Sequence, residues 1–280
     1  METLTIYSDE ELKRIQGLEL ECLKVIIKIC ENIGVEYFLI GGTTLGAIRH
    51  QGFIPWDDDI DIGMTRENYV KFLKQAPILL PSQYHLQTPY DGTNNPYFYS
   101  KVRINGTKFV EYSNHRVDMH QGVYIDIFPF DEVPDNEEEN KLHFETVQKL
   151  IIIFTLRQSP DVSMQPKNFK DHIKAIARRV IHCLYKKMSY SKIANELEKT
   201  ITKYNGTNQS AYGCLNFPVR KTEYIKKVDL YPLVDYKFED IVAKIPNNYE
   251  AYLTTHYGDY LKLPPKEQRF GHKPYKVDFG

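Results

Sequence analysis

The stretch LIGGTTLGAIRHQGFIPWDDDIDIG, residues 39–63, joins an apolar segment to a glycine turn and ends with four aspartates within five positions. In its last part, charged and apolar side chains alternate, which predicts a strand. Asp59 and Asp61 would share one face of this strand, and the isoleucines would face a core. Two carboxylates on one face repel each other unless a cation neutralises them, and oxygen ligands favour Mg²⁺ or Mn²⁺. The stretch therefore predicts a strand that carries a divalent metal site.

Other interpretations of the aspartate run are weaker. A solvated acidic loop stays open, although Trp56 and the alternating isoleucines are not typical of one. A calcium-binding EF-hand loop is excluded, because Ile62 and Asn68 occupy the positions that require glycine and glutamate. Helix capping would explain one aspartate and not four.

Two further features add to this candidate site. Gly41-Gly42-Thr43 follows an apolar strand and precedes a short helix, where backbone N–H groups can bind phosphate. A turn that needs glycine for its geometry alone is the alternative. Asp126 is a lone charge in the apolar strand VYIDIF, which favours metal binding or general-base function over display on an edge strand. Together these groups could hold two metal ions for an in-line phosphoryl transfer, with Asp126 as the general base.

The composition is that of a globular protein. The chain has 280 residues, of which 42% are hydrophobic and 26% charged, enough for one large domain or two modest ones. The net charge of −1 argues neither for nor against nucleic acid, and we expect no nucleic-acid partner. The four cysteines have no metal-binding spacing, which fits a reducing compartment. No signal peptide or membrane-spanning run is visible, so we expect a cytoplasmic protein. Contact with the inner face of the plasma membrane is left open.

The first 130 residues predict an alternation of helices and strands. The expected elements are a helix between Ser8 and Gly34, strands at 35–42 and 59–64, a helix from Thr65 that stops before Pro77, a hairpin of 98–104 and 107–112 around Asn105-Gly106, and a strand at 122–130 that Pro129 and Asp131 end. This order indicates an α+β or α/β core, in which helices flank a mixed sheet.

Residues 135–205 differ from the rest because their pattern is almost wholly helical. We therefore divide the chain into a catalytic core at 1–134, a helical insert at 135–205, and a C-terminal segment at 206–280. The C-terminal segment would pack on the core and complete the site for the phosphoryl donor. The helix expected at 172–188 combines an apolar stripe with many basic residues. Such a helix can lie on an anionic membrane. This position would suit an enzyme whose phosphoryl acceptor is linked to a lipid. Packing of the stripe on the core is the favoured alternative.

These motifs resemble those of the LicD family of phosphocholine transferases and the related fukutin-type proteins. The resemblance begins in GGTTLGAIRHQGFIPWDDDIDIG and continues in SKVRINGT, GVYIDIFPFDEVP and YLTTHYGDYLKLPP, residues 100–107, 122–134 and 252–265. It implies an α+β fold with a nucleotidyltransferase-like mixed sheet, and Mg²⁺ chemistry on a cytidine diphosphate donor, typically CDP-choline. Phosphocholine would pass to a sugar hydroxyl of a teichoic acid or surface-polysaccharide precursor, and CMP would leave.

The resemblance also implies roles for individual residues. The expected metal ligands and catalytic acids are Asp59, Asp61 and Asp126. The residues expected to bind substrate are Gly42, Thr43, Thr44, Arg49, His50, Lys101, Arg103, Tyr257 and Asp259. Gly42 and Thr43 would hold donor phosphates, and Arg49 with His50 would meet the transferred phosphate. A surface ion pair is an equal alternative for Lys101 and Arg103.

Other functions remain open at this point. A glycosyltransferase also uses Asp-x-Asp with a metal, but it would release a nucleoside diphosphate. An adding-type nucleotidyltransferase would release pyrophosphate from a nucleoside triphosphate. A metal-stabilised scaffold without activity would mainly lose stability when Asp59 is changed. Choline itself is a family inference, and ethanolamine, ribitol or glycerol phosphate could replace it.

Overall fold

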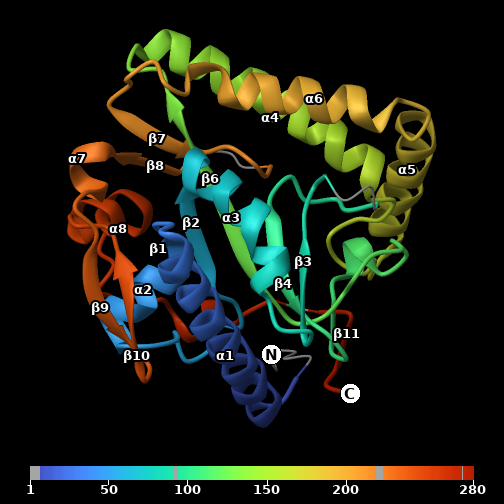
Figure 1. Cartoon of the computed structure of the whole chain (residues 1–280). Coiled ribbons are helices and arrows are strands. Elements are labelled where there is room, and N and C mark those ends of the chain that lie inside the picture. Colours follow the sequence, from blue (N-terminus) through green and yellow to red (C-terminus); the bar gives the residue numbers. More distant parts are fainter. Residues whose placement is uncertain (1–6, 91–93, 219–222, 273) are drawn as a thin grey trace.

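The computed structural model describes residues 7–90, 94–218, 223–272 and 274–280 (Figure 1). The helices are α1 (Asp9–Ile33), α2 (Gly41–His50), α3 (Arg66–Leu79), α4 (Glu137–Gln158), α5 (Phe169–Tyr185), α6 (Tyr190–Ile201), α7 (Lys227–Leu230) and α8 (Tyr249–Tyr257). The strands are β1 (Phe38–Leu39), β2 (Asp61–Thr65), β3 (Tyr84–Gln87), β4 (Ser100–Ile104), β5 (Lys108–Val110), β6 (Tyr124–Val133), β7 (Ala211–Cys214), β8 (Glu223–Lys226), β9 (Val234–Phe238), β10 (Ile241–Ile245) and β11 (Lys276–Asp278).

A mixed sheet forms the centre of the molecule, which confirms the α+β fold. Its main path runs β1-β2-β6-β4-β3, and β7 and β8 extend it from the far end of β6. β2 and β6 are parallel, with Asp61 opposite Asp126. β4 is antiparallel to β6 and places Lys101 opposite Asp126. The register alone therefore brings these three charged residues into one row across neighbouring strands.

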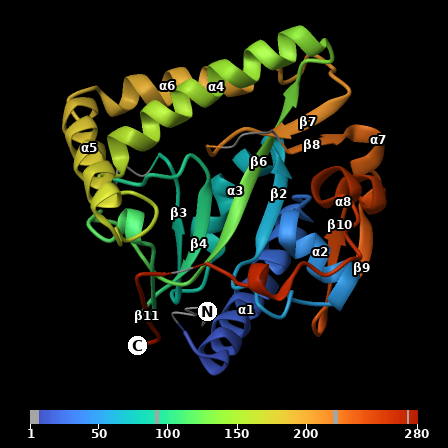
Figure 2. The ribbon, with the colours of Figure 1, turned by 180° about the vertical axis from the view of Figure 1, so that it is seen from behind.

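The two faces of this sheet have different neighbours. Helices α1 and α3 cover one face, as Figure 1 shows, and they enclose a core that includes Ile62 and Ile125 of the sheet. Because side chains alternate along a strand, Asp61 and Asp126 point to the opposite face. Figure 2 shows that face, with the C-terminal segment passing across its lower end. The candidate catalytic side chains thus lie on the face that α1 and α3 leave uncovered.

The segment between β6 and β7 is helical, as predicted. Helices α4 and α6 lie along one another across one end of the sheet, and α5 follows α4 at the edge of the molecule (Figures 1 and 2). The helices share an apolar cluster with the sheet edge, in which Phe154 and Leu197 contact Phe98 and Leu215. The division of the chain into core, insert and C-terminal segment stays a prediction.

The predicted hairpin around Asn105-Gly106 is wrong. Both strands exist, but β4 pairs with β3 and β6, whereas β5 pairs with β11 near the C-terminus. Gly106 adopts a positive φ of 80°, which makes the turn, and the chain then leaves the sheet. Both edges of β4 are already occupied, so β5 has no free edge of β4 to pair with.

Both proline-based boundaries are also wrong. α3 continues through Pro77 to Leu79, since the proline lies in the last turn, where Leu80 N–H still bonds to Ala76. β6 continues through Pro129 to Val133. The ladder of β6 with β4 ends at Ile127 and that with β7 begins at Asp131, so the missing N–H of Pro129 falls between two ladders.

Strand bounds near the glycine turn differ too. The strand expected at 35–42 is only Phe38–Leu39, because Gly41 already begins α2. β2 begins at Asp61, so Asp59 lies in the preceding loop. The start and end of α1 are confirmed: Ser8 and Glu11 form the capping box, and Gly34 ends the helix in the left-handed conformation.

Candidate active site

The glycine turn and the aspartate run are in contact. A Cβ atom placed on Gly42 would lie 2.9 Å from Asp57 Oδ2, and one on Gly41 would lie 3.7 Å from Asp61 Oδ2. The backbone N–H of Asp61 donates to Thr43 Oγ1 at 2.8 Å. Since these glycines form the first turn of α2, the positive end of that helix faces the carboxylates. The absence of side chains at the turn leaves room for the carboxylates and for a ligand.

The carboxylates of Asp57 and Asp59 are half-buried and lie among other negative charges. Burial, together with the charges of Asp59 and Asp58, raises the pKa of Asp57 to about 8. Burial also raises the pKa of Asp59. The site therefore contains more carboxylate groups than it can keep ionised without a cation.

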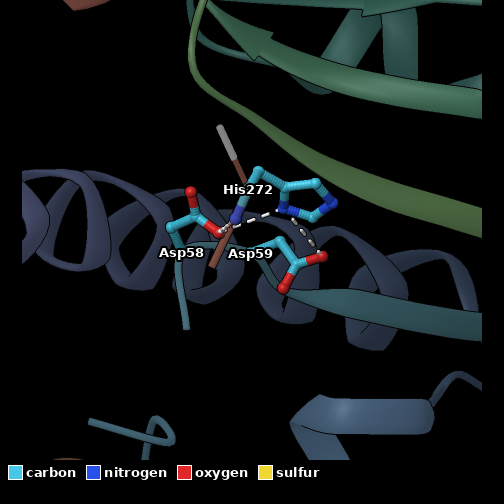
Figure 3. A group of neighbouring side chains, drawn as sticks. All are labelled: Asp58, Asp59 and His272. Carbon is cyan, nitrogen blue, oxygen red and sulfur yellow. Dashed lines mark hydrogen bonds and ion pairs between the residues drawn. The ribbon is translucent and has the colours of Figure 1, made fainter. Parts of the chain in front are cut away.

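Asp58 lies beside Asp59 and links two segments that are far apart in the chain. Its carboxylate accepts hydrogen bonds from the Tyr7 hydroxyl at 2.6 Å and from the backbone and Nδ1 of His272 at 2.9 and 3.0 Å (Figure 3). His272 Nδ1 also lies 3.8 Å from Asp59 Oδ2. Burial opposes protonation of His272, but the bond to Asp58 and the charge of Asp59 outweigh it and raise its pKa to about 10.

Asp58, Asp59 and His272 have ligand atoms within 4.8 Å of one another, close enough to surround a metal ion. However, both oxygens of Asp58 already accept hydrogen bonds, and Nδ1 of His272 is used in one of them. We therefore regard Asp58 and His272 as a structural link between the loop and the C-terminal segment. Nothing in the local sequence pattern around His272 indicated this contact.

Asp126 forms a buried ion pair with Lys101. Lys101 Nζ lies 2.5 Å from Asp126 Oδ1, and the two side chains are 1% and 9% exposed. The edge-strand interpretation of Asp126 and the surface-pair interpretation of Lys101 are therefore wrong. Burial raises the pKa of Asp126, against the opposing charge of Lys101, and burial lowers the pKa of Lys101.

Tyrosine rings surround the Lys101 ammonium. Its Nζ lies 3.5, 4.3 and 5.2 Å from the ring centres of Tyr124, Tyr97 and Tyr99. Such cation–π contacts stabilise an ammonium that has lost its water. The rings hold Lys101 in place, and Lys101 in turn fixes the position of Asp126.

Arg103, the next residue on the same strand face, has different contacts. It is 1% exposed, its Nε donates to Gln87 at 2.6 Å, and its Nη1 donates to the Gly122 carbonyl at 2.9 Å. These bonds tie Arg103 to the surrounding strands. Its role in phosphate binding stays a prediction.

The remaining predicted residues lie at the two ends of α2. Near the first turn, Thr44 is fully buried, and the Tyr257 hydroxyl would lie 3.8 Å from a Cβ on Gly41. Near the last turn, Arg49 donates to the carbonyl of Tyr260 at 3.0 Å and to His50 Nε2 at 3.0 Å. His50 also packs edge-on to the ring of Trp56, 6.3 Å between centres. Asp259 is exposed.

Glu19 of α1 is a further acidic residue that the sequence analysis missed. It is 2% exposed, and its Oε2 has no hydrogen-bond partner among the residues that the structure describes. Burial and the charge of Asp59 raise its pKa well above the usual range. The available signal was a glutamate on the apolar face of α1, between Ile15 and Cys22.

Comparison with known proteins supports the family resemblance. The family model for the LicD/FKTN/FKRP nucleotidyltransferase domain matches residues 34–160. Lipopolysaccharide cholinephosphotransferase LicD of Haemophilus influenzae is 31% identical over 271 residues, 92% of this chain and 94% of that protein. Ribitol 5-phosphate transferase FKRP of Homo sapiens is 44% identical over 48 residues, 17% of this chain and 10% of that protein. Because the similarity to LicD extends over nearly the whole of both chains, this chain belongs to the LicD family and is a LicD-type phosphotransferase.

Proposed function

We propose that the chain transfers phosphocholine from CDP-choline to a sugar hydroxyl of a teichoic acid or surface-polysaccharide precursor, with release of CMP. The observation that carries the proposal is the group of half-buried carboxylates at the first turn of α2. The similarity to a cholinephosphotransferase over 92% of the chain supports choline as the donor alcohol. The α2 turn would bind the diphosphate of the donor through its backbone N–H groups.

The residues of this site fit a hard divalent cation, which we propose is Mg²⁺ or Mn²⁺. The candidate ligands Asp59, Asp61 and Asp126 offer only oxygen atoms, as such ions prefer. Beside the effect of burial, the charges of Asp59 and Asp58 raise the pKa of Asp57, which indicates that negative charge here is not fully compensated. A bound ion would stabilise the charge that develops on the transferred phosphate.

The side chains of the protein would act on the acceptor and the donor phosphates. In the proposed reaction an acceptor oxygen attacks the phosphorus that carries choline, and the bond from this phosphorus to CMP breaks. Asp126 would take the proton of the acceptor hydroxyl, with Lys101 as the residue that positions it. Arg49 and His50 would contact the transferred phosphate, and Tyr257 with Asp259 would close over the nucleotide.

We propose a lipid-linked glycan as the acceptor and the cytoplasmic face of the plasma membrane as the place of action. The helical insert at 135–205 would contact this acceptor or its membrane, and the segment at 206–280 would complete the donor site. In the part of the chain that the structure describes, no helix combines the length and the apolar character needed to cross a bilayer. Contact with the membrane would therefore be peripheral for these residues.

CMP release tests the proposal. We would incubate the protein with CDP-choline, Mg²⁺ and a lipid-linked glycan fraction, beside Asp59→Asn and the exposed control Asp235→Asn. We expect acceptor-dependent CMP from the wild type and the control, and a loss of about a hundredfold or more in Asp59→Asn, which should remain folded by circular dichroism. Undiminished turnover in a folded Asp59→Asn protein would exclude the metal role of Asp59.

Other donors distinguish the second candidate function. The local match to a ribitol 5-phosphate transferase makes CDP-ribitol the next donor to test. CMP release from CDP-ribitol but not from CDP-choline would keep the reaction class and change the alcohol. Release of a nucleoside diphosphate from a nucleotide sugar would instead favour a glycosyltransferase.

A further inference from the structure

The apolar stripe of α5 points to solvent. Ile176, Val180 and Leu184 are 60%, 56% and 62% exposed, and Phe169 at the start of the helix is 79% exposed. Ile173 continues the stripe at 50%. These residues recur at intervals of three or four and therefore lie on one side of the helix. The expectation that this stripe packs on the core is wrong.

Polar contacts fix this orientation. Arg178 donates to the carbonyls of Ser159 and Thr155 at 3.1 and 3.0 Å. Arg179 pairs with the buried Asp161 at 2.9 Å, and His182 contacts the carbonyl of Leu156. In this helix, polar side chains hold the inner face and apolar side chains form the outer face, which reverses the usual arrangement.

The stripe lies on the side of α5 that faces away from the rest of the protein. At about 100° per residue, the stripe is centred roughly 180° from the buried positions Ala175 and His182. Figures 1 and 2 show α5 at the outer edge of the molecule, beyond the ends of α4 and α6. No described element therefore covers this side of the helix.

Basic residues flank the stripe. The exposed lysines in and around α5 are Lys167, Lys170, Lys174, Lys186 and Lys187, whereas Asp171 is the acidic residue in the same segment. A second copy of this face would meet the same excess of positive charge, so the charge opposes self-association. An apolar stripe bordered by lysines instead complements a bilayer that contains anionic lipids.

We propose that α5 binds the interface of an anionic lipid bilayer, with the stripe in the acyl-chain boundary and the lysines among the headgroups. The inference concerns the membrane partner and rests on the proposed function only for its purpose, the capture of a lipid-linked acceptor. A pocket of about 490 Å³ supports this purpose. Arg178 of α5 lines one side of the pocket, and Tyr97 and Tyr99, which contact Lys101, line another. The pocket lies on the inner side of α5, between the helix and the tyrosines that contact Lys101.

Vesicle binding tests this proposal directly. We would measure co-sedimentation of the full chain with vesicles of phosphatidylcholine alone and with phosphatidylglycerol added. We expect binding to the anionic vesicles that weakens as salt is raised. Ile176→Glu should weaken vesicle binding by about tenfold or more. The double variant Lys170→Gln, Lys174→Gln should weaken it by about 25-fold, because each lysine contributes roughly fivefold.

Ile78→Glu is the matched control, because Ile78 lies in α3, is 85% exposed and undergoes the same substitution. It should bind vesicles like the wild type. Equal binding by Ile176→Glu and the wild type, or no binding of the wild type to anionic vesicles at low salt, would overturn the proposal. A wild-type dimer that Ile176→Glu dissociates, without vesicle binding, would assign the stripe to a second copy instead. Because the measurement requires no donor or turnover, failure of the proposed reaction would not affect it.

Discussion

The buried ion pair between Lys101 and Asp126 leads to a quantitative prediction about stability. Lys101→Met keeps most of the side-chain volume but leaves the Asp126 carboxylate without its cation in a site where both side chains are nearly inaccessible. Removal of one partner of a buried pair costs about 3–5 kcal/mol, because the remaining charge is uncompensated. The ammonium also loses its contacts with the rings of Tyr124 and Tyr97. We expect the free energy of unfolding to fall by about 3–5 kcal/mol.

Urea denaturation in the presence of EDTA would measure this change, since the chelator prevents a divalent ion from neutralising Asp126. Asp126→Asn and the double variant complete a mutant cycle, in which we expect a coupling of about 1–3 kcal/mol. Lys24→Met is the control, because the ion pairs of Lys24 with Glu21 and Asp240 are exposed to solvent and should contribute little to stability. Additive effects in the cycle, or a loss in Lys101→Met no larger than in Lys24→Met, would refute the assignment of a buried, energetically coupled pair.

Two further predictions concern packing and pH. Gly63→Ala should lower the free energy of unfolding by about 1–3 kcal/mol, because its Cβ would lie 2.7 and 2.8 Å from the rings of Phe38 and Phe130. Gly17 lies in α1, where an added Cβ would have no atom within 4 Å, so Gly17→Ala should instead raise the free energy of unfolding by about 0.5–1 kcal/mol. Urea denaturation compares the two variants, and equal effects would contradict the packing argument. Since the pKa of His272 is raised to about 10 in the folded state, its stabilising effect should be complete below its ordinary value near 6.5 and lost as the pH rises through 10. Thermal unfolding measured across this pH range should show the loss of stability, and the loss should be smaller in Asp58→Asn. An equally large loss in the variant would contradict the stabilising contact between Asp58 and His272.

Local signals in the sequence predicted local structure well. The capping box at Ser8 and the glycine at position 34 marked the two ends of α1. The alternation after Asp59 correctly placed Ile62 in the core and Asp61 on the opposite face. Such signals depend on neighbouring residues only, so a single chain without relatives already contains them.

Long-range pairing could not be predicted in the same way. The turn at Asn105-Gly106 is real, yet the strand after it pairs with β11, more than 160 residues further along the chain. His272 meets Asp58 across 214 positions, and Glu19 reaches the acidic group from a helix that precedes it. These contacts depend on how whole elements pack, and no short-range pattern encodes that packing. The prolines show the same limit: Pro129 stays in register with β2, and on the other edge of β6 it falls between the ladders with β4 and β7.

The aspartates of the run can be separated into two sets by the contacts of their side chains. Asp57 and Asp61 lie against the glycine turn, and Asp59 lies beside Asp57 in the same half-buried group. Asp58 also has an oxygen within 4.8 Å of Asp59 and His272, but both of its oxygens accept hydrogen bonds from Tyr7 and His272. Three aspartates therefore form the acidic group at the glycine turn, while Asp58 fastens the loop that carries them to the C-terminal segment.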